Sequence, residues 1–343
     1  MGTTVVISDQ GVVQTSGATS LTVNGPVTML EADEVPDDAL VVGVSMMGAP
    51  TVMVEKLPSG GEHREALNAL SEFLGEQVSH LVCVEAGGIN SMVPFAVSAA
   101  TNLPLIDADA MGRAFPELQM KLPGLEGINT APMALADEKG NISVIRTAEN
   151  RWSERLARAL TIEMGCSAAT AQLVMRGNDV RRSMSLGTLT RAEAIGSAIR
   201  RAQEQHGNPV SAAISAIGGY LLFAGKIVDV LRTTSRGFAL GNARIAGIDQ
   251  WSGSELELDF QNEHLVARRD NQVVATVPDL IAALDNQTGE PVNTEAMRFG
   301  LRVSVLGAPC DPRWRSPAGL DVVGPRYFGY NLEYRPVEEL VSA

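Results

Sequence analysis

The sequence predicts an α/β domain followed by a mainly β domain. Residues 38–170 alternate short apolar runs with helical periodicity, the pattern of β-α-β units around a mostly parallel sheet. After residue 207 the apolar runs are closely spaced and broken by Gly, Asn or Asp, which is typical of antiparallel strands in a barrel or sandwich. We therefore expect a layered α/β domain over residues 1–170, and a mainly β domain, either a barrel or a sandwich, with an inserted helix over residues 171–343.

Three strands and two helices are predicted in the first domain. The apolar run ALVVGVSMM, residues 39–47, is typical of a buried strand. A helix follows the capping-box sequence SGGE at residues 59–62, because Leu67, Leu70 and Leu74 recur at helical spacing. The runs HLVCVE, residues 80–85, and LPLIDAD, residues 103–109, predict the next two strands, with a helix over residues 93–101 between them.

The second domain is predicted from short aliphatic runs. A helix that carries Ile195 and Ile199 precedes them and opens with the capping-box sequence TRAE at residues 190–193. SELELDF alternates Leu with Glu, so we expect one face of that strand to be wet. The predicted antiparallel strands are YLLFAGKIVDVLRTT, GFALGNARIAGI, SELELDF, HLVARRD and QVVATV.

Composition excludes several classes of function. The formal net charge of -13 would repel a phosphate backbone, and no cluster of Lys or Arg interleaved with aromatic residues offsets it, which argues against nucleic-acid binding. No apolar run approaches the roughly 20 residues of a membrane span, and the N-terminus has no signal-peptide pattern, so we expect a cytoplasmic protein. The low aromatic content of 4% and the many aliphatic residues are compatible with a homo-oligomer.

Acidic residues follow two neighbouring predicted strands. HLVCVE ends at Glu85, and LPLIDAD contains Asp107 and Asp109. Ligands bind beyond the carboxyl ends of the strands in an open parallel sheet, so we expect these three carboxylates to meet at one rim. Carboxylates that share a dry site have separated pKa values, as general acid and base catalysis requires. A structural interpretation stays open, in which Asp107 and Asp109 only cap the following turn and helix.

Residues around this rim are candidates for substrate binding. Gly87 and Gly88 permit close approach of the backbone, and Asn90 offers amide donors. Arg113 could hold a carboxylate of the substrate or serve as a structural ion-pair partner of the acids. The predicted substrate-binding residues are Gly87, Gly88, Asn90, Met111, Gly112, Arg113, Glu117, Gln261 and Asn262.

A divalent metal ion is an alternative to a side-chain base. Glu85, Asp107 and Asp109, with Glu117 nearby, resemble a hard-cation set. The four histidines form no H-x-x-x-H pair, which argues against zinc. The sequence itself requires no cofactor.

Two other motifs have both a structural and a functional interpretation. FQNE, which contains Gln261 and Asn262, follows a predicted strand and either satisfies a turn or reaches toward the site. Cys83 lies in a predicted buried strand, where a free thiol more often packs as a small hydrophobe than acts as a nucleophile. The other cysteines, Cys166 and Cys310, are widely spaced and form no C-x-x-C, which argues against a disulfide framework or a structural zinc site.

A series of longer motifs resembles one protein family. MMGAPTVMVEKLPSG, VEAGGIN, DADAMGRAFPELQM, GFALGNARI, LDFQNEHLVA, VPDLIAALDNQTGEPVNTEAMRFGLRV and VGPRYFGYNLEY occur in the order expected of the S-methyl-thiohydantoin desulfurase family. The resemblance runs from about residue 33 to the C-terminus, and it implies a three-layer α/β domain with a β-barrel-like C-terminal domain. Family members usually begin with Leu-Gly-x-Gly-Gly-Gly-Gly, and residues 1–30 contain no such run. Either this branch has lost a loop or it forms its site differently.

The resemblance implies a hydrolytic desulfurase. The substrate would be an S-methyl-thiohydantoin ring, in which water attacks the carbon between the two ring nitrogens and methanethiol leaves. This chemistry needs a base for water, an acid for the ring nitrogen and donors for the developing charge. We assign Glu85 or Asp109 as base and Asp107 as its partner. Asn90 is assigned as donor, and Arg113 as anchor for an anionic arm of the substrate.

Two other functions stay open. The family is sometimes found beside hydantoinases, so the protein could be an accessory subunit that binds hydantoin-like molecules next to a hydantoinase or oxoprolinase. It could also be a small-molecule binding or assembly protein in which the Asp-Ala-Asp segment is structural. Release of methanethiol from an S-methyl-thiohydantoin separates the first function from both alternatives.

Overall fold

The described part of the chain forms two compact units. The computed structural model describes residues 5–8, 11–14, 27–48, 52, 56, 58–235 and 238–342. Much of residues 1–30, where the glycine run of the family is missing, and much of the motif at residues 46–60 fall outside this description. One unit, here called the α/β unit, comprises Gly17–Gly112 and Glu117–Leu189. The other, here called the β unit, comprises Met1–Ser16, Arg113–Pro116 and Thr190–Ala343.

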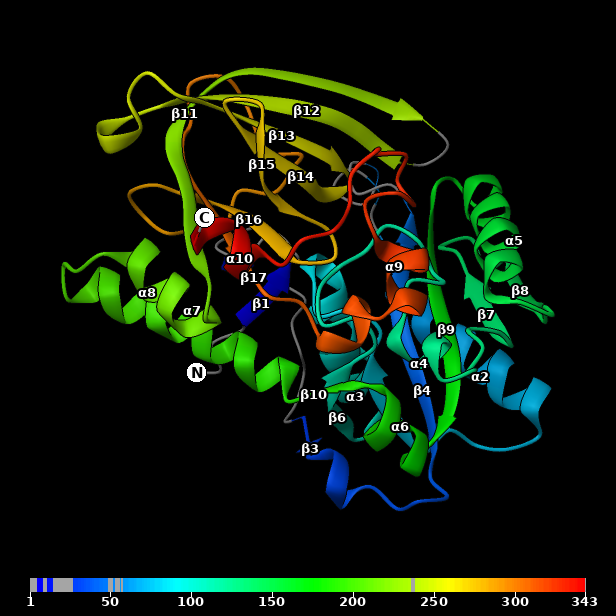
Figure 1. The fold of residues 1–343 in the computed structure, drawn as a ribbon. Coiled ribbons are helices and arrows are strands. Elements are labelled where there is room, and N and C mark those ends of the chain that lie inside the picture. The colour runs from blue at the N-terminus through cyan, green and yellow to red at the C-terminus, as the bar shows by residue number, and fades with distance from the viewer. Residues whose placement is uncertain are drawn as a thin grey trace. The chain divides into compact units, whose positions relative to one another are not determined.

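A mixed sheet of eight strands forms the centre of the α/β unit within the described residues (Figure 1). Its strands are β3 (Met29–Leu30), β4 (Leu40–Gly48), β5 (His80–Cys83), β6 (Leu105–Asp109), β7 (Met133–Ala136), β8 (Ile142–Ile145), β9 (Ser167–Arg176) and β10 (Ser185–Leu186). They lie in the order β10-β6-β5-β4-β9-β7-β8, and β3 also pairs with β6.

The predicted parallel pairing holds for one part of this sheet. β3 pairs in parallel with β6, β6 with β5, and β5 with β4. The pairs β10 with β6, β4 with β9, β9 with β7, and β7 with β8 are antiparallel, so the sheet is mixed rather than mostly parallel. A short turn at residues 137–141 joins β7 to β8, and so short a connection permits only antiparallel pairing.

Alternate residues of β5 and β6 enter two different apolar cores. The helices of this unit are α2 (Glu62–Leu74), α3 (Val93–Thr101), α4 (Leu122–Leu125), α5 (Asn150–Glu163) and α6 (Gly177–Ser183). Leu81 and Leu105 share a core with residues of α2 and α3. Val82 and Ile106 share the other core with Val180 of α6. Because side chains of a strand alternate between its faces, both faces of these strands are buried, which explains their continuous apolar sequence.

Local sequence explains where α2 begins and ends. The Glu62 carboxylate accepts hydrogen bonds from the backbone N–H groups of Ser59 (2.5 Å) and Gly60 (2.9 Å). The helix begins at Glu62 with Gly61 as its N-cap, so it starts later than the predicted capping box at Ser59 would place it. It ends at Gly75, whose φ of 70° lies in the left-handed region that favours glycine.

A curled antiparallel half-barrel forms the main body of the β unit (Figure 1). Its strands are β11 (Tyr220–Ser235), β12 (Phe238–Gly247), β13 (Glu255–Gln261), β14 (Glu263–Arg269), β15 (Gln272–Thr276), β16 (Leu280–Asp285) and β17 (Arg302–Ala308). The order is β15-β14-β13-β12-β11-β17-β16. Irregularities interrupt the register between β11 and both of its neighbours and on both sides of β14, and such bulges increase the local twist.

The remaining elements of the β unit are one hairpin, the 17-residue helix α7 and several shorter helices. They are β1 (Val5–Ser8), β2 (Gly11–Gln14), α7 (Thr188–Glu204, whose first two residues belong to the α/β unit), α8 (Pro209–Ile217), η3 (Asp249–Trp251), η4 (Pro312–Arg315), α9 (Pro317–Val323) and α10 (Val337–Ser342). None of the helices in the described ranges is long and apolar enough to cross a membrane.

β13 shows the alternation that its sequence predicts. Leu256, Leu258 and Phe260 are buried, and the residues between them are half-buried. Leu256 and Leu258 belong to the main apolar core of the half-barrel. The prediction of one wet face on this strand is confirmed.

Candidate functional site

The three predicted acids lie around one buried thiol of the α/β unit. β5 ends at Cys83, which stands in register with Asp109 at the end of β6. Burial raises the pKa of the Cys83 thiol well above its usual range, and the charges of Asp109, Glu85 and Asp107 raise it further. β5 and β6 are parallel neighbours, and Glu85 follows the last residue of β5 by two positions. The structure thus brings Glu85, Asp107 and Asp109 to the same end of two neighbouring strands.

Cys83 itself is a structural residue. Its thiol donates a hydrogen bond to the backbone oxygen of Glu85 (2.9 Å) and approaches that of Asn90 (3.4 Å). A thiol with a raised pKa stays protonated at neutral pH, and the protonated form is not a nucleophile. The thiol instead fixes the loop that leads away from β5.

Asp107 and Asp109 both have structural tasks. One carboxylate oxygen of Asp109, Oδ1, accepts hydrogen bonds from the backbone N–H groups of Met111 and Gly112, each at 2.5 Å. Oδ1 of Asp107 accepts from the backbone N–H of Leu189 at 2.8 Å, in the first turn of α7. These bonds are the capping contacts that the structural interpretation of the sequence expected. If either acid takes part in catalysis, it does so while its Oδ1 atom also holds these backbone N–H groups.

Asn90 pins the loop after β5 to the end of β4. Its side-chain oxygen accepts from the backbone N–H of Met46 (2.7 Å), and its Nδ2 donates to the backbone oxygen of the same residue (3.2 Å). Asn90 lies in a short 3-10 helix, η2 (Gly88–Ser91). Gly88 begins this turn with a φ of +51°, which is the left-handed conformation that glycine adopts readily, and Gly87 before it is extended. The amide predicted to be a substrate donor therefore has a positioning role.

Lys121 is a functional candidate that the sequence analysis missed. Its side chain is buried, with 2% exposure, and Nζ donates to the side-chain oxygen Oε1 of Gln172 at 2.6 Å. Burial lowers the pKa of Lys121 to about 7, although the charges of Glu154 and Glu85 oppose this shift. A lysine with a pKa near neutrality can both give and take a proton at physiological pH. Of the two glutamates whose charges act on the Lys121 amine, Glu154 has the larger effect and Glu85 the smaller one.

The sequence carries a weak signal for Lys121. The chain has only four lysines, Lys56, Lys121, Lys139 and Lys226. Lys121 stands in the run LQMKLPGL, directly between Met120 and Leu122, which are themselves buried. A charged residue among apolar neighbours is rarely buried unless it has a partner or a function, and this pattern could have identified Lys121.

Arg113 does not lie free to anchor a substrate. It belongs to the β unit, where its side chain is 3% exposed. Its guanidinium group donates to the backbone oxygens of Ala114 (3.0 Å), Asp279 (2.6 Å) and His264 (3.1 Å). These bonds give Arg113 a structural role within the β unit, and its role as an anchor for an anionic arm of the substrate stays a prediction.

The FQNE motif forms a turn of the β unit. Gln261 ends β13, and Asn262 has a φ of +54° between β13 and β14. The side-chain oxygen of Asn262 accepts from the backbone N–H of Ala239 (2.8 Å), and its backbone oxygen accepts from the hydroxyl of Thr294 (2.6 Å). Of the two interpretations of this motif, these contacts favour the structural one.

The metal alternative has no geometric support in the described residues. Within those ranges, no group of three or more His, Cys, Asp or Glu side chains is placed to hold a metal ion. Glu85, Asp107 and Asp109 therefore form no ligand set within the described part of the chain. Glu117, the fourth predicted member, accepts a short hydrogen bond from the Gln119 amide.

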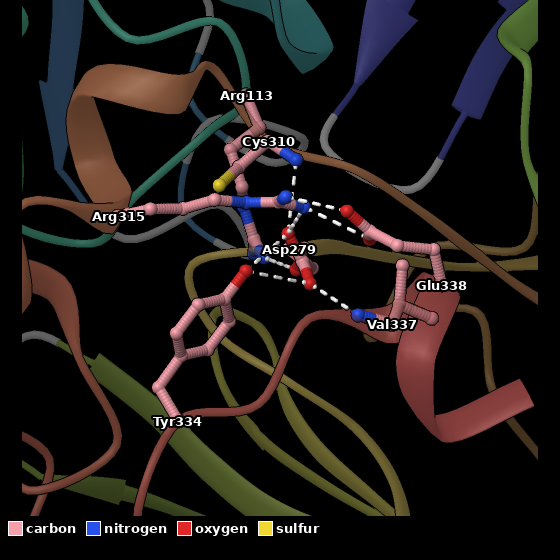
Figure 2. A network of polar contacts seen from close by, with 7 residues as sticks. All are labelled: Arg113, Asp279, Cys310, Arg315, Tyr334, Val337 and Glu338. Atoms are coloured by element: carbon pink, nitrogen blue, oxygen red, sulfur yellow. Dashed lines mark hydrogen bonds and ion pairs between the residues drawn. The ribbon is translucent and has the colours of Figure 1, made fainter. Parts of the chain in front are cut away.

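A second polar network lies in the β unit and is structural. Figure 2 shows the Asp279 carboxylate at its centre. The carboxylate accepts hydrogen bonds from the backbone N–H groups of Cys310 (3.0 Å) and Val337 (2.8 Å), from the guanidinium of Arg315 (3.0 Å) and from the hydroxyl of Tyr334 (3.0 Å). Arg315 also pairs with Glu338 of α10 at 2.5 Å. Asp279 is fully buried, so these donors stabilise its charge and tie the C-terminal segment to the half-barrel.

Comparisons with known proteins agree with this architecture. A crystal structure of a protein from Chromobacterium violaceum matches with a TM-score of 0.76 and 22% sequence identity, over 96% of this chain and 95% of that one. At this identity the match supports the fold alone. The comparison with curated proteins gave no match. Family models described as the S-Me-THD-like N-terminal domain and the S-Me-THD-like C-terminal domain match residues 10–147 and 148–337. Because these two models together span nearly the whole chain, the protein belongs to the S-Me-THD-like family.

Proposed function

We propose that the protein is a hydrolase that removes methanethiol from an S-methyl-thiohydantoin, with Glu85 and Lys121 as its proton-transfer pair. Membership of the S-Me-THD-like family supports a thiohydantoin-related function in general. The observation that carries the proposed chemistry is the buried amine of Lys121, whose pKa burial lowers to about 7 and on which the charge of Glu85 acts. A proton donor and a proton acceptor next to each other are what hydrolysis of this ring requires.

The reaction balances without any further reactant. Water adds to the ring carbon between the two nitrogens, one water proton passes to a base, and the adjoining ring nitrogen receives a proton from an acid. The tetrahedral intermediate then collapses to a carbonyl as the C–S bond breaks, and methanethiol leaves with a proton. One ring and one water thus become one hydantoin and one methanethiol.

Lys121 suits the acid role better than an ordinary lysine. Its pKa of about 7 makes its ammonium group roughly three thousand times more acidic than a solvated lysine. Half of the molecules therefore carry the proton at pH 7, and its transfer to a ring nitrogen is far less uphill. Glu85, which follows β5 and is half-buried, is the nearby carboxylate assigned as base.

The other predicted residues take supporting roles in this proposal. Asp107 and Asp109 hold backbone N–H groups, and Asn90 holds Met46. At Gly88 no atom of the described residues, apart from its two chain neighbours, lies within 4 Å of the position that a Cβ would take, which leaves room for a flat ring beside the backbone. Arg113 is not part of the proposal because backbone carbonyl groups occupy its guanidinium group.

The test is turnover of a 5-substituted S-methyl-thiohydantoin. Methanethiol is measured with a thiol reagent, and the hydantoin by mass spectrometry. Lys121→Met should lower kcat by about 100-fold or more, since loss of a general acid typically has this effect. The matched control is Lys139→Met, which removes a lysine whose side chain is 66% exposed and should keep full activity.

The pH dependence gives a second measurement. Because the proposed acid must be protonated, kcat/KM should fall as the pH rises through about 7. If Lys121→Met, or the double variant Asp107→Ala and Asp109→Ala, turned over the substrate at the wild-type rate, the assignment of this site would be wrong. If wild-type protein binds the ring without forming product, the protein is instead an accessory or binding protein.

A further inference from the structure

Three uncharged polar side chains are buried in the sheet and are linked to Lys121 by hydrogen bonds through Gln172. Ser45 of β4 is 2% exposed, and Thr170 and Gln172 of β9 are 0% exposed. Ser45 and Thr170 are register partners across the two strands. A buried polar side chain without a partner destabilises a protein by about 1–3 kcal/mol, so a group of three in a sheet interior requires an explanation.

Hydrogen-bond accounting determines how the Gln172 amide is oriented. Its amide nitrogen, Nε2, has two hydrogens and donates to the hydroxyl oxygens of Ser45 and Thr170, each at 2.9 Å. Thr170 donates its own hydroxyl hydrogen to the backbone oxygen of Ser45 (3.1 Å). The Ser45 hydroxyl, 2.8 Å from that of Thr170, is then the donor between the two. Both hydroxyl oxygens are thus left to accept, and the amide oxygen must face Lys121.

We propose that Gln172 is a positioning residue, which holds the Lys121 amine through a fixed and uncharged oxygen so that the amine can release its proton during the reaction. This inference rests on the proposed function. The amide oxygen lies 2.6 Å from Nζ and directs the amine. It carries no charge, so it does not retain the proton as a carboxylate in the same place would.

The charged groups that face Lys121 support this role. Glu154 of α5 and Glu85 after β5 both favour the protonated amine. Glu154 is largely occupied elsewhere, because its carboxylate accepts from the backbone N–H of Leu118 (2.9 Å) and pairs with Arg158 (2.5 Å). An acid at position 172 would add a third, closer charge, so the neutral amide is what leaves the proton mobile.

The test replaces the amide with its isosteric acid. Gln172→Glu should raise the titration midpoint of Lys121 by roughly 1–3 pH units, since a carboxylate within hydrogen-bonding distance favours the ammonium form. The midpoint is measured by NMR on protein labelled with [ε-¹³C]lysine, where four lysines give four signals and Lys121→Met identifies one. The fall of kcat/KM at high pH should shift by the same amount. Gln250→Glu, at an exposed position, is the matched control and should change neither.

If Gln172 only filled the interior of the sheet and did not hold the Lys121 amine, Gln172→Glu would lower stability and leave the titration midpoint of Lys121 unchanged. A folded Gln172→Glu variant whose midpoint lies within about 0.3 units of the wild-type value overturns the inference. A second variant, Thr170→Val, removes one acceptor of the amide and keeps position 172. It should lower kcat by roughly fivefold or more with KM unchanged, because a misplaced catalytic group reacts more slowly. An unchanged kcat would also count against the inference. If the Lys121 midpoint shifts in Gln172→Glu but neither the wild type nor any variant turns over the substrate, the proposed function is refuted. The contact by which Gln172 holds the Lys121 amine is then still supported.

Discussion

Replacing Lys121 with methionine should remove a pH-dependent part of the stability. In the unfolded chain a lysine keeps its proton up to a pH of about 10. In the folded protein burial lowers the pKa of Lys121 to about 7, so above that pH the folded state binds fewer protons than the unfolded state. Stability therefore rises with pH between about 7 and 10, because the unfavourable buried charge is progressively discharged.

The magnitude follows from the size of the shift. Each pH unit over which the two states differ by one proton changes the free energy of unfolding by about 1.4 kcal/mol. Lys121 is half titrated at pH 7, so its contribution between pH 7 and pH 9 should be about 2 kcal/mol. Lys121→Met lacks this contribution, although it is also destabilised at every pH because the Gln172 oxygen loses its partner.

The assay is urea unfolding of both proteins at constant ionic strength between pH 7 and pH 9. The quantity of interest is the wild-type free energy of unfolding minus that of the variant, which should increase by about 2 kcal/mol across this range. Burial raises the pKa of Cys83 and that of Cys310, the latter to about 12, and this lowers stability at higher pH, but both thiols are present in both proteins and cancel. Lys139→Met is the control, and its difference from wild type should stay constant.

A flat difference for Lys121→Met would refute the reasoning. It would mean that the folded protein accommodates the ammonium group as well as water does, so that Lys121 keeps an ordinary pKa. The proposed acid would then be protonated throughout the physiological range and poorly suited to donate its proton.

Three further outcomes follow from the described contacts. Asp279→Asn should lower the free energy of unfolding by about 3 kcal/mol in urea denaturation, because a buried charge network loses its centre, while the exposed Asp321→Asn should have no effect. His264→Phe should raise stability by about 1 kcal/mol, since neither ring nitrogen of this buried residue has a hydrogen-bond partner among the residues that the structure describes. It should also reduce the loss of wild-type stability as the pH falls from about 6.5 toward 3, because burial lowers the pKa of His264 to about 3 and only the unfolded chain gains the proton there. Asp107→Ala should cost about 1 kcal/mol through loss of its bond to the N–H of Leu189, and an unchanged melting temperature would contradict this capping role.

The order and type of most elements could be predicted from periodicity. β5 and β6 were predicted from continuous apolar runs because both faces of these strands are buried. β13 was predicted from the alternation of Leu with Glu, because only one face of this strand is buried. The pairing of β9 with β4 could not be predicted in this way, since it depends on residues far apart in the chain.

The candidate site shows the same division. Glu85, Asp107 and Asp109 were identified because carboxyl ends of neighbouring parallel strands lie at one edge of a sheet. Arg113 was assigned to the same place because it stands close in sequence to Asp109. Its actual partners, the carbonyl groups of Asp279 and His264, lie more than a hundred residues further along the chain.

The sequence by itself determined the α/β and β character of the two regions, the family and the chain segment that carries the acids, because periodicity, turn residues and motifs are local properties. Only the tertiary structure decided which polar groups are paired. It placed Lys121 among Gln172, Glu85 and Glu154, which are contributed by three separate segments of the chain. The physical reason is that the pKa of a group depends on burial and on nearby charges, and both are set by packing between distant segments rather than by neighbours in sequence.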